Sequence, residues 1–307
     1  MITVLLATYN GEKYISEQLD SLINQTYTDF RIAISDDGST DKTPEILNEY
    51  QKKYPDKIEI LEGEKSGSAK NNFMKLLLHC NGGYVMFCDQ DDYWQSGKIE
   101  KTYKKMLESE KQFKDMPILI HTDICVADSN LNIISNSFFD FQRISPDFNK
   151  LNNVLVQNNV TGCTVMINEA LLLELKKNPP KEFAMHDWWL NLVATLKGKV
   201  GYITEPTMLY RQHGDNEVGA KKATGIEFIV NKYKSRNKTR QNYLDAFSQA
   251  KSLLDIYGET MTEDQKSTVK AFISLESGSK LKKVKTIRKY DFRKNTLLRT
   301  IGQYISI

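Results

Sequence analysis

The sequence predicts an α/β fold in which a mostly parallel central sheet is flanked by helices. Over the first 130 residues, short apolar runs typical of buried strands alternate with segments whose apolar residues recur at helical spacing. In addition, a polar cluster follows three of the apolar runs directly. Ligands of such sheets bind beyond the carboxyl ends of the strands, so the sequence also predicts where a site would lie.

The predicted elements follow one another in regular order. Apolar runs predict strands at residues 2–7, 30–35, 57–61, 84–88 and 117–126. Helical spacing predicts helices at residues 14–25, 42–54 and 71–80. Pro44 stands where proline is favoured at the start of a helix. The alternation implies parallel strands joined by helical connections.

The pattern becomes less regular after residue 130. A short strand leading into a helix is expected near residues 168–177, and residues 187–198 are expected to form a helix closed by Gly198. The segment GYITEPTMLYRQHGDN (201–216) indicates either a strand pair or a strand and a loop. From about Gly225 the pattern is helical and increasingly charged.

Composition is that of a soluble globular protein, with 40% hydrophobic and 26% charged residues. The cysteines are widely spaced, form no C-x-x-C pair, and are expected to be buried free thiols in a reducing compartment: Cys80, Cys88, Cys125 and Cys163. The N-terminus has no basic start typical of a signal peptide, and no apolar run reaches the length of a membrane span. We therefore expect a cytoplasmic protein.

Charge is unevenly distributed along the chain. Residues 221–307 contain 19 Lys and Arg against 8 Asp and Glu, a net charge of +11, whereas residues 1–220 have a net charge of −8. A basic segment of this kind predicts an anionic partner, either a membrane surface or a nucleic acid.

The acidic run Asp89-Gln90-Asp91-Asp92 follows a predicted strand. Carboxylates this close repel one another unless a cation binds, and Mg²⁺ or Mn²⁺ prefers oxygen ligands. The alternative is a solvated acidic turn. The apolar strand before the run and Trp94 after it favour a metal site.

The run DDGST (36–40) has the composition of an ordinary turn. The functional alternative is that Asp36 accepts a hydrogen bond from the imide N–H of a nucleobase, with Thr8, Tyr9 and Asn10 lining the same pocket and Tyr9 stacking on the base. The chain has neither a P-loop nor a G-x-G-x-x-G motif after a strand, so metal and basic side chains would have to meet the phosphates.

In their order and spacing, ATYNGEKYISEQLDSLINQTY, ISDDGSTDKT and FCDQDDYW resemble the inverting family 2 glycosyltransferases with the A-type fold. The resemblance covers roughly residues 1–220 and implies a catalytic domain there, followed by a helical basic C-terminal extension at 221–307. It implies a nucleotide site at Thr8, Tyr9, Asn10, Glu12, Asp36, Lys70, Asn71 and Asp89. Lys70 and Asn71 would run along the ribose and diphosphate, and Asp91, the second acid of the D-x-D pair, would contact the metal most directly.

The run His186-Asp187-Trp188-Trp189 supplies a candidate general base. Asp187 could take the proton of an acceptor hydroxyl, and Trp94, Trp188 and Trp189 are candidates for contact with the acceptor or the sugar. The structural alternative is that Asp187 caps the following helix and the tryptophans are core residues. Family members have a Glu-Asp pair here; this chain has His186 in place of the Glu, so only Asp187 carries over and the role of His186 is open.

The segment YRQHGDN (210–216) resembles the Arg-x-His segment of many family members. Arg211 would contact the diphosphate and His213 would ligate the metal. The alternative for His213 is an ordinary loop histidine.

The resemblance implies a direct displacement in which Asp187 deprotonates the acceptor and the anomeric configuration inverts, without a covalent intermediate. The processive-synthase segment Q-x-x-R-W and membrane spans are both absent from the sequence, so we expect transfer of single sugars. The motifs look most like bacterial rhamnosyltransferases of cell-wall and capsular polysaccharide synthesis, which implies a dTDP-L-rhamnose donor. UDP-glucose and UDP-galactose are the alternative donors.

Residues 278–305 contain nine Lys and Arg against one acidic residue, interleaved with apolar residues. Such a segment could lie on an anionic membrane surface, where a lipid-linked glycan acceptor would be found, or could be a solvated face or an oligomer contact. A non-catalytic nucleotide- or carbohydrate-binding protein is the alternative from another class. We do not expect nucleic-acid binding, because the body is acidic and lacks a basic-aromatic repeat. ATYNGEKY lacks the Gly-rich loop expected of a nucleotidyltransferase.

Overall fold

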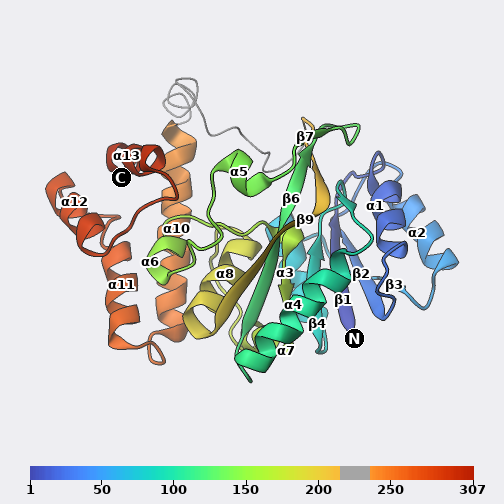
Figure 1. Ribbon diagram of the computed structural model, residues 1–307, viewed down its shortest axis with the longest axis horizontal. Helices are drawn as coiled ribbons and strands as arrows, with labels where there is room; N and C mark the ends of the chain where they lie inside the picture. Colours follow the sequence, from blue (N-terminus) through green and yellow to red (C-terminus); the bar gives the residue numbers. More distant parts are fainter. Residues whose placement is uncertain (215–235) are drawn as a thin grey trace. The chain divides into compact units, whose positions relative to one another are not determined.

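The computed structural model describes residues 1–214 and 236–307 (Figure 1). The chain divides into two compact units. Unit 1 comprises Met1–Phe138, Thr161–Lys177 and Lys199–Ala220, and unit 2 comprises Phe139–Val160, Asn178–Gly198 and Lys221–Ile307. Among the helices of the described ranges, we find none whose length and hydropathy would let it cross a lipid bilayer.

Nine strands of the described residues form one sheet in unit 1, in the order β3-β2-β1-β4-β8-β6-β9-β5, with β7 paired to β6. The strands are β1 (Ile2–Thr8), β2 (Phe30–Asp36), β3 (Ile58–Ile60), β4 (Tyr84–Cys88), β5 (Tyr93–Trp94), β6 (Ile118–Ala127), β7 (Ile133–Ser135), β8 (Met166–Ile167) and β9 (Lys199–Arg211). The first four are mutually parallel, and β6 is parallel to β9. The antiparallel pairings are each only two residue pairs long. The predicted α/β class with a mostly parallel sheet is therefore confirmed.

Residues 201–216 were predicted as a strand pair or as a strand and a loop; residues 215 and 216 lie outside the described residues, and the rest confirms the strand and loop. Strand β9 is continuous from Lys199 to Arg211, where it ends, and residues 212–214 belong to no strand. Its register with β6 shifts between two successive residue pairs, Thr122 with Ile203 and Asp123 with Pro206. Proline donates no backbone hydrogen bond, so it is tolerated in a strand at such an irregularity. Pro206 therefore lies at this irregularity without ending the strand.

Helices flank the sheet of unit 1. They are α1 (Ile15–Ile23), α2 (Thr43–Lys53), α3 (Ala69–His79), α4 (Lys98–Gln112) and α7 (Glu169–Lys177). Helix α3 packs against β1 and β2, and α4 packs against β6 and β9. Pro44 lies in the first turn of α2, as predicted.

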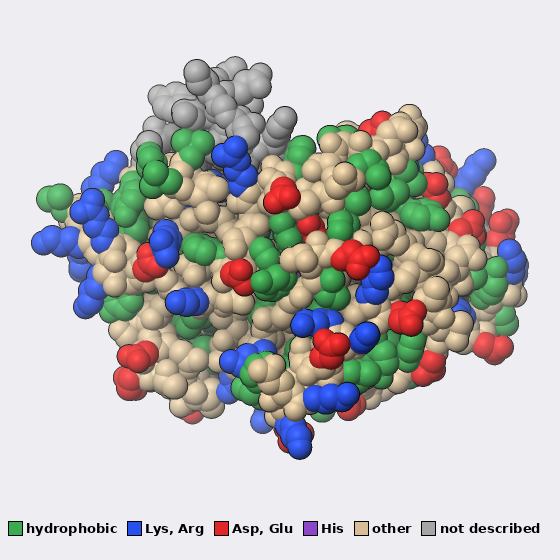
Figure 2. Space-filling model, in the orientation of Figure 1, with side chains coloured by type: hydrophobic (Ala, Val, Ile, Leu, Met, Phe, Trp, Pro, Cys, Tyr) green, Lys and Arg blue, Asp and Glu red, His purple; other side chains and the backbone are tan. Residues whose placement is uncertain are grey.

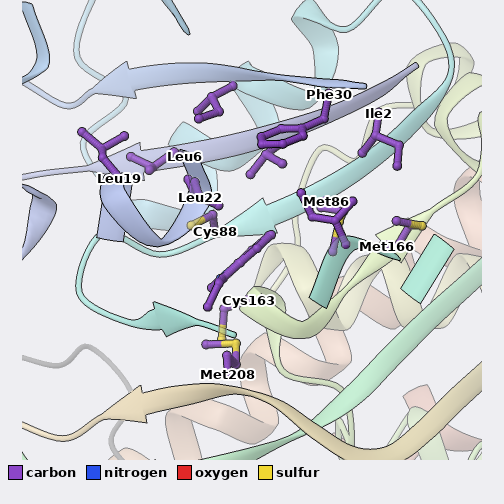
Figure 3. Packing of buried hydrophobic residues seen from close by; sticks show 14 of the residues in the cluster. Ile2, Leu6, Leu19, Leu22, Phe30, Met86, Cys88, Cys163, Met166 and Met208 are labelled. Carbon is purple, nitrogen blue, oxygen red and sulfur yellow. The ribbon is translucent and has the colours of Figure 1, made fainter. Parts of the chain in front are cut away.

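The core of unit 1 forms between the sheet and these helices. Every residue of β1 is buried, so its near-continuous apolar run is that of a strand covered on both faces. Figure 3 shows Leu6, Met86 and Cys163 among the packed side chains of this cluster. The four cysteines are buried and free, which confirms the prediction of unpaired thiols.

Unit 2 is helical in the residues described. Its helices are α5 (Phe138–Gln142, which starts at the last residue of a unit 1 segment), α6 (Leu151–Val154), α8 (His186–Lys197), α10 (Arg236–Tyr257), α11 (Glu263–Ile273), α12 (Lys280–Lys289) and α13 (Leu297–Ser306). Gly198 closes α8, as predicted. The rings of Phe247, Phe272 and Phe292 pack in series, with centroids 5.1 and 5.4 Å apart.

The helical pattern predicted from about Gly225 is confirmed from Arg236 onward, and residues 225–235 lie outside the described residues. The described part of 221–307 folds together with residues 139–160 and 178–198 as unit 2. The assignment of catalysis to 1–220 and of an extension to 221–307 concerns function and stays a prediction.

Candidate active site

Three parallel strands bring their polar ends to one edge of the unit 1 sheet. Thr8 pairs with Asp36 at the ends of β1 and β2, and Leu6 pairs with Cys88 at the end of β4. The acidic run that starts at Asp89 therefore follows directly beside the ends of the other two strands. This is the edge at which the sequence predicted a site.

Asp36 holds the turn that follows β2. Its Oδ2 accepts hydrogen bonds from the backbone N–H of Gly38 at 3.1 Å and of Ser39 at 2.8 Å. Gly38 has a φ of +79°, in the left-handed region that glycine adopts without strain. Since a carboxylate has about four acceptor positions, Asp36 can serve this turn and still accept a further hydrogen bond.

The D-x-D loop is tied to the end of β1 by a side chain that sequence reasoning did not single out. The Gln90 carboxamide accepts from the backbone N of Tyr9 at 2.9 Å and donates to its carbonyl at 3.0 Å. Tyr9 is held at both backbone groups while 55% of the residue is exposed. Thr8 is buried, so of Thr8 and Tyr9 only the tyrosine presents its side chain to solvent.

Asn10 and Glu12 brace the same edge. Asn10 has a φ of +48°, and its Oδ1 accepts from the backbone N of Thr40 at 2.9 Å. Glu12 accepts from the backbone N of Lys42 at 2.9 Å. Both side chains therefore join the segment after β1 to the segment after β2.

The segment that begins α3 joins this edge through Asp37. Its carboxylate accepts from the backbone N–H groups of Ser66 and Gly67. Lys70 and Asn71 lie in the first turn of α3, and the Asn71 amide donates to the Ser66 carbonyl at 3.2 Å. The structure thus brings both predicted residues to the β2 turn, and Asp37 is a residue that the sequence analysis missed.

Asp92 is the buried member of the acidic run. Its Oδ1 accepts from the backbone N of Arg211 at 3.1 Å. Burial raises the pKa of Asp92 well above its usual range, and the neighbouring charges of Asp91 and Asp89 raise it further. Three carboxylates therefore repel one another at this loop, which is the electrostatic setting of a cation site.

The ligand atoms of Asp89, Asp92 and Cys163 lie within 4.8 Å of one another. Burial also raises the pKa of the Cys163 thiol well above its usual range, so the sulfur stays protonated. A protonated thiol is a poor ligand for Mg²⁺ or Mn²⁺, which prefer oxygen ligands. The deep side of the cluster therefore suits these metals less well than the outer side.

Asp91 and His213 form the outer side of the cluster. The His213 Nε2 lies 2.8 Å from the Asp91 Oδ2, and the His213 ring packs 4.8 Å from the ring of Tyr14. Both side chains are largely but not fully covered. A carboxylate and an imidazole at this separation fit a divalent cation, so the residues predicted as ligands do lie together.

Arg211 has protein partners around its whole guanidinium. Its Nε donates to the Asp91 carbonyl at 2.7 Å, its Nη1 donates to the Ser129 carbonyl at 2.6 Å, and its Nη2 pairs with the Glu17 carboxylate. Its side chain is 3% exposed. In the structure the guanidinium holds the acidic loop; the predicted contact with the diphosphate is untested and stays a prediction.

Trp94 is a correction to the predicted sugar contacts. It is fully buried in the unit 1 core, with the Lys98 ammonium 4.7 Å from its ring centroid. Lys98 is also fully buried and donates to the Thr207 hydroxyl at 3.2 Å, and burial lowers its pKa to about 8. Because no face of Trp94 reaches solvent, we remove it from the site.

Asp187 and its neighbours belong to unit 2. Asp187 lies in the first turn of α8, and its Oδ1 accepts from the backbone N of Trp188 at 2.6 Å. Trp188 is half-buried and its indole donates to the Val154 carbonyl at 2.6 Å, whereas Trp189 is fully buried. Trp189 is therefore a core residue and a second correction to the predicted sugar contacts. Burial lowers the pKa of His186 to about 3, so it is neutral.

Comparisons with known proteins give a consistent result. Residues 3–168 match the family model described as glycosyl transferase family 2. The chain is 35% identical over 232 residues to the dTDP-rhamnosyl transferase RfbG of Shigella flexneri, a match covering 70% of this chain and 74% of that protein.

Two solved structures share the fold. One is S. aureus TarS 1–349 in complex with UDP-GlcNAc, with a TM-score of 0.52 and 18% identity over 94% of this chain and 80% of that chain. The other is the mannosyltransferase PcManGT from Pyrobaculum calidifontis in complex with GDP-Man and Mn²⁺, with a TM-score of 0.52 and 16% identity over 99% and 84% of the two chains. Together with the family match, they identify the sheet as the A-type glycosyltransferase fold.

Proposed function

Because the chain belongs to glycosyltransferase family 2, we propose that it transfers single sugars from a nucleoside diphosphate to a glycan hydroxyl, with inversion at the anomeric carbon. One observation carries the proposal. The ends of three parallel strands form a single hydrogen-bonded edge that joins the Asp36 turn, the exposed Tyr9 and the Asp91–His213 pair. This edge offers base, ribose, phosphate and metal contacts within one unit.

The nucleotide would lie along the edge as follows. Tyr9 stacks on the base, and Asp36 accepts from the imide N–H, which uracil and thymine share. Thr8, Asn10 and Glu12 shape this pocket. Lys70 and Asn71, at the start of α3, follow the ribose and diphosphate, and Asp89 contacts the ribose side.

Asp91 and His213 would hold the divalent cation, Mg²⁺ or Mn²⁺. When bound, such a cation neutralises the charge that develops on the diphosphate leaving group. Arg211 positions Asp91 by donating to the Asp91 backbone carbonyl. Gln90 attaches the same loop to the end of β1 through its two hydrogen bonds with the Tyr9 backbone. The protein's own hydrogen bonds therefore fix the loop before any ligand arrives.

Asp187 is the proposed general base. It would accept the proton of the acceptor hydroxyl as that oxygen attacks the anomeric carbon. Of the tryptophans, Trp188 is half-buried and keeps part of its ring available for a sugar. The buried, neutral His186 is a packing residue in this proposal.

The donor that we propose is dTDP-L-rhamnose. The support is the 35% identity to RfbG, which extends over 74% of that protein and thus beyond the shared nucleotide pocket. UDP-glucose and UDP-galactose are the alternative donors, because the contact with the imide does not separate uracil from thymine. The acceptor would be a glycan of bacterial surface polysaccharide synthesis, carried on a lipid at an anionic membrane that the C-terminal segment contacts.

A panel of nucleotide sugars tests the proposal. Release of nucleoside diphosphate from dTDP-L-rhamnose, UDP-glucose and UDP-galactose is measured with Mn²⁺, Mg²⁺ or EDTA, with and without glycan acceptors. We expect turnover with dTDP-L-rhamnose and loss of turnover in Asp91→Asn and Asp187→Asn. Glu108→Gln, an exposed acid on α4, is the matched control and should keep full activity.

Two outcomes would contradict the proposal. Full activity of both carboxylate variants would show that the residues are assigned wrongly. Tight nucleotide binding without turnover of any donor would favour the non-catalytic alternative.

A further inference from the structure

Helix α13 has an inverted orientation: polar side chains attach it to the rest of unit 2, and three of its apolar side chains, those of Leu297, Leu298 and Ile301, are exposed. Gln303 is fully buried and donates to the Phe292 carbonyl at 2.8 Å, and Arg299 donates to the Gln142 carbonyl at 2.8 Å. On the other face, Leu297 is 78% exposed and Ile301 is 48% exposed. A surface helix of a globular protein ordinarily turns its apolar face inward, so this arrangement needs a reason.

Helix α12 places a dense positive charge on the same unit. Six of its ten residues are basic: Lys280, Lys282, Lys283, Lys285, Arg288 and Lys289. None of the six forms an ion pair with another described residue. Leu281, in the first turn, is 79% exposed between these charges.

The two helices present one mixed surface. The Gln303–Phe292 hydrogen bond folds α13 back onto the segment directly after α12. Figure 2 shows Lys and Arg side chains interleaved with hydrophobic ones at the left edge, where Figure 1 draws α12 and α13. We name this surface the terminal patch: the six basic residues of α12 with Leu281, Leu297, Leu298 and Ile301.

We propose that the terminal patch binds the interface of an anionic lipid bilayer, with the lysines and arginine at the headgroups and the exposed leucines and isoleucine below them. The one-sided charge favours an anionic partner. The exposed aliphatic side chains decide which one, because a nucleic acid backbone offers no apolar layer whereas the acyl boundary of a bilayer does. This inference deepens the proposed function, since a lipid-linked acceptor would lie at the same surface.

Vesicle binding tests the terminal patch with the whole chain. Co-sedimentation is measured with phosphatidylcholine vesicles and with vesicles that also contain phosphatidylglycerol, at low and high salt. We expect binding only to the anionic vesicles and weakening by salt. Replacing Lys282 and Lys285 by Gln should weaken binding by about 5-fold per lysine, since one basic residue near an anionic surface contributes about one such factor.

The apolar side is tested by Leu297→Ser/Ile301→Ser, which should weaken binding by about 10-fold or more because two buried aliphatic side chains are lost. Leu173→Ser is the matched control, because Leu173 is 55% exposed but lies on α7 in unit 1. The control should bind as the parent does. Circular dichroism and the thermal midpoint verify that each variant is folded.

The outcomes separate the proposals. Absence of binding to anionic vesicles, or binding unaltered by both the Lys and the Leu/Ile variants, overturns the membrane proposal. So does a dimer in light scattering that Leu297→Ser/Ile301→Ser converts to monomer, since the patch would then join two copies. Asp91→Asn should retain vesicle binding but lose turnover. The variants of the terminal patch should lose vesicle binding but retain turnover with a water-soluble acceptor. A failure of the proposed function can therefore be distinguished from a failure of the membrane proposal.

Discussion

Replacing Arg211 by lysine tests whether this residue clamps the acidic loop or contacts the donor's diphosphate. Lysine keeps the positive charge but lacks the planar fork that reaches three partners at once. In the structure those partners are the carbonyls of Asp91 and Ser129 and the carboxylate of Glu17. The substitution therefore removes geometry while preserving charge.

The expected cost follows from the burial of each contact. The two backbone acceptors lie at a side chain that is 3% exposed, and each charge-assisted hydrogen bond contributes about 1.5 kcal/mol, so their loss costs about 3 kcal/mol. The Glu17 side chain is 48% exposed, so its pair with Arg211 adds at most about 1 kcal/mol. Glu17→Gln should therefore destabilise the protein much less than Arg211→Lys.

The assay combines urea denaturation with the dependence of turnover on Mn²⁺ and on donor. A displaced Asp91 should raise the half-saturating Mn²⁺ concentration by about 10- to 100-fold, the usual effect of losing a residue that orients a ligand. A direct diphosphate contact predicts a different result: unaltered stability and Mn²⁺ dependence, with weaker binding of the free nucleoside diphosphate without metal. That second pattern would refute the clamp.

Three further predictions concern titration and charge. Burial lowers the pKa of His121 from 6.5 to about 4, so the unfolded chain takes up a proton before the folded chain does as the pH falls. The stability that is present above pH 6.5 is therefore lost between pH 6.5 and about 4, and the loss is about 2 kcal/mol at pH 5. In urea denaturation at pH 7 and 5, His121→Phe should reduce the pH dependence by that amount, and an unchanged slope would contradict it. Lys98→Met should leave stability at pH 7 equal or raise it by about 1–3 kcal/mol, because burial penalises the charged ammonium. A large loss of stability in the same assay would show that the Thr207 hydrogen bond and the Trp94 contact outweigh that penalty. Mn²⁺ at 100 times its dissociation constant should stabilise the folded chain by about 2.7 kcal/mol, measurable as a thermal shift that Asp91→Asn abolishes and Glu108→Gln retains.

The sequence was a good guide wherever a local pattern determines the structure. The run 2–7 is apolar throughout and became β1, which is buried on both faces, and the acidic and Asp-Gly-Ser runs lie at strand ends because parallel strands share one carboxyl edge. The short strand β8 leading into helix α7 was also predicted, whereas β5 is two residues long and shows no periodicity from which it could be predicted. The grouping of residues 139–160 and 178–198 with the C-terminal helices is likewise set by long-range packing.

The same contrast between local sequence patterns and long-range contacts applies to the site residues. Those that follow a strand directly could be singled out from the sequence, whereas Gln90 was missed because its partner Tyr9 is 81 residues away. The surroundings of Arg211 come from positions 82, 120 and 194 residues distant, so its sequence neighbours could suggest an anion-binding role but not identify the anion. Trp94 looked like a sugar platform because aromatic residues beside acidic loops often are, and only the packing around Lys98 shows that it is core.

The acidic loop shows how the fold distributes charge at the proposed cation site. Of its three carboxylates, Asp92 is buried with a raised pKa, so it carries least of the negative charge. Arg211 supplies a positive charge from inside the protein, bound at the Asp91 carbonyl and leaving the Asp91 carboxylate to His213. Negative charge that remains available to a ligand on the outer side is thereby concentrated at Asp91. A metal held as proposed could therefore leave with the product while the internal cation keeps the loop in place.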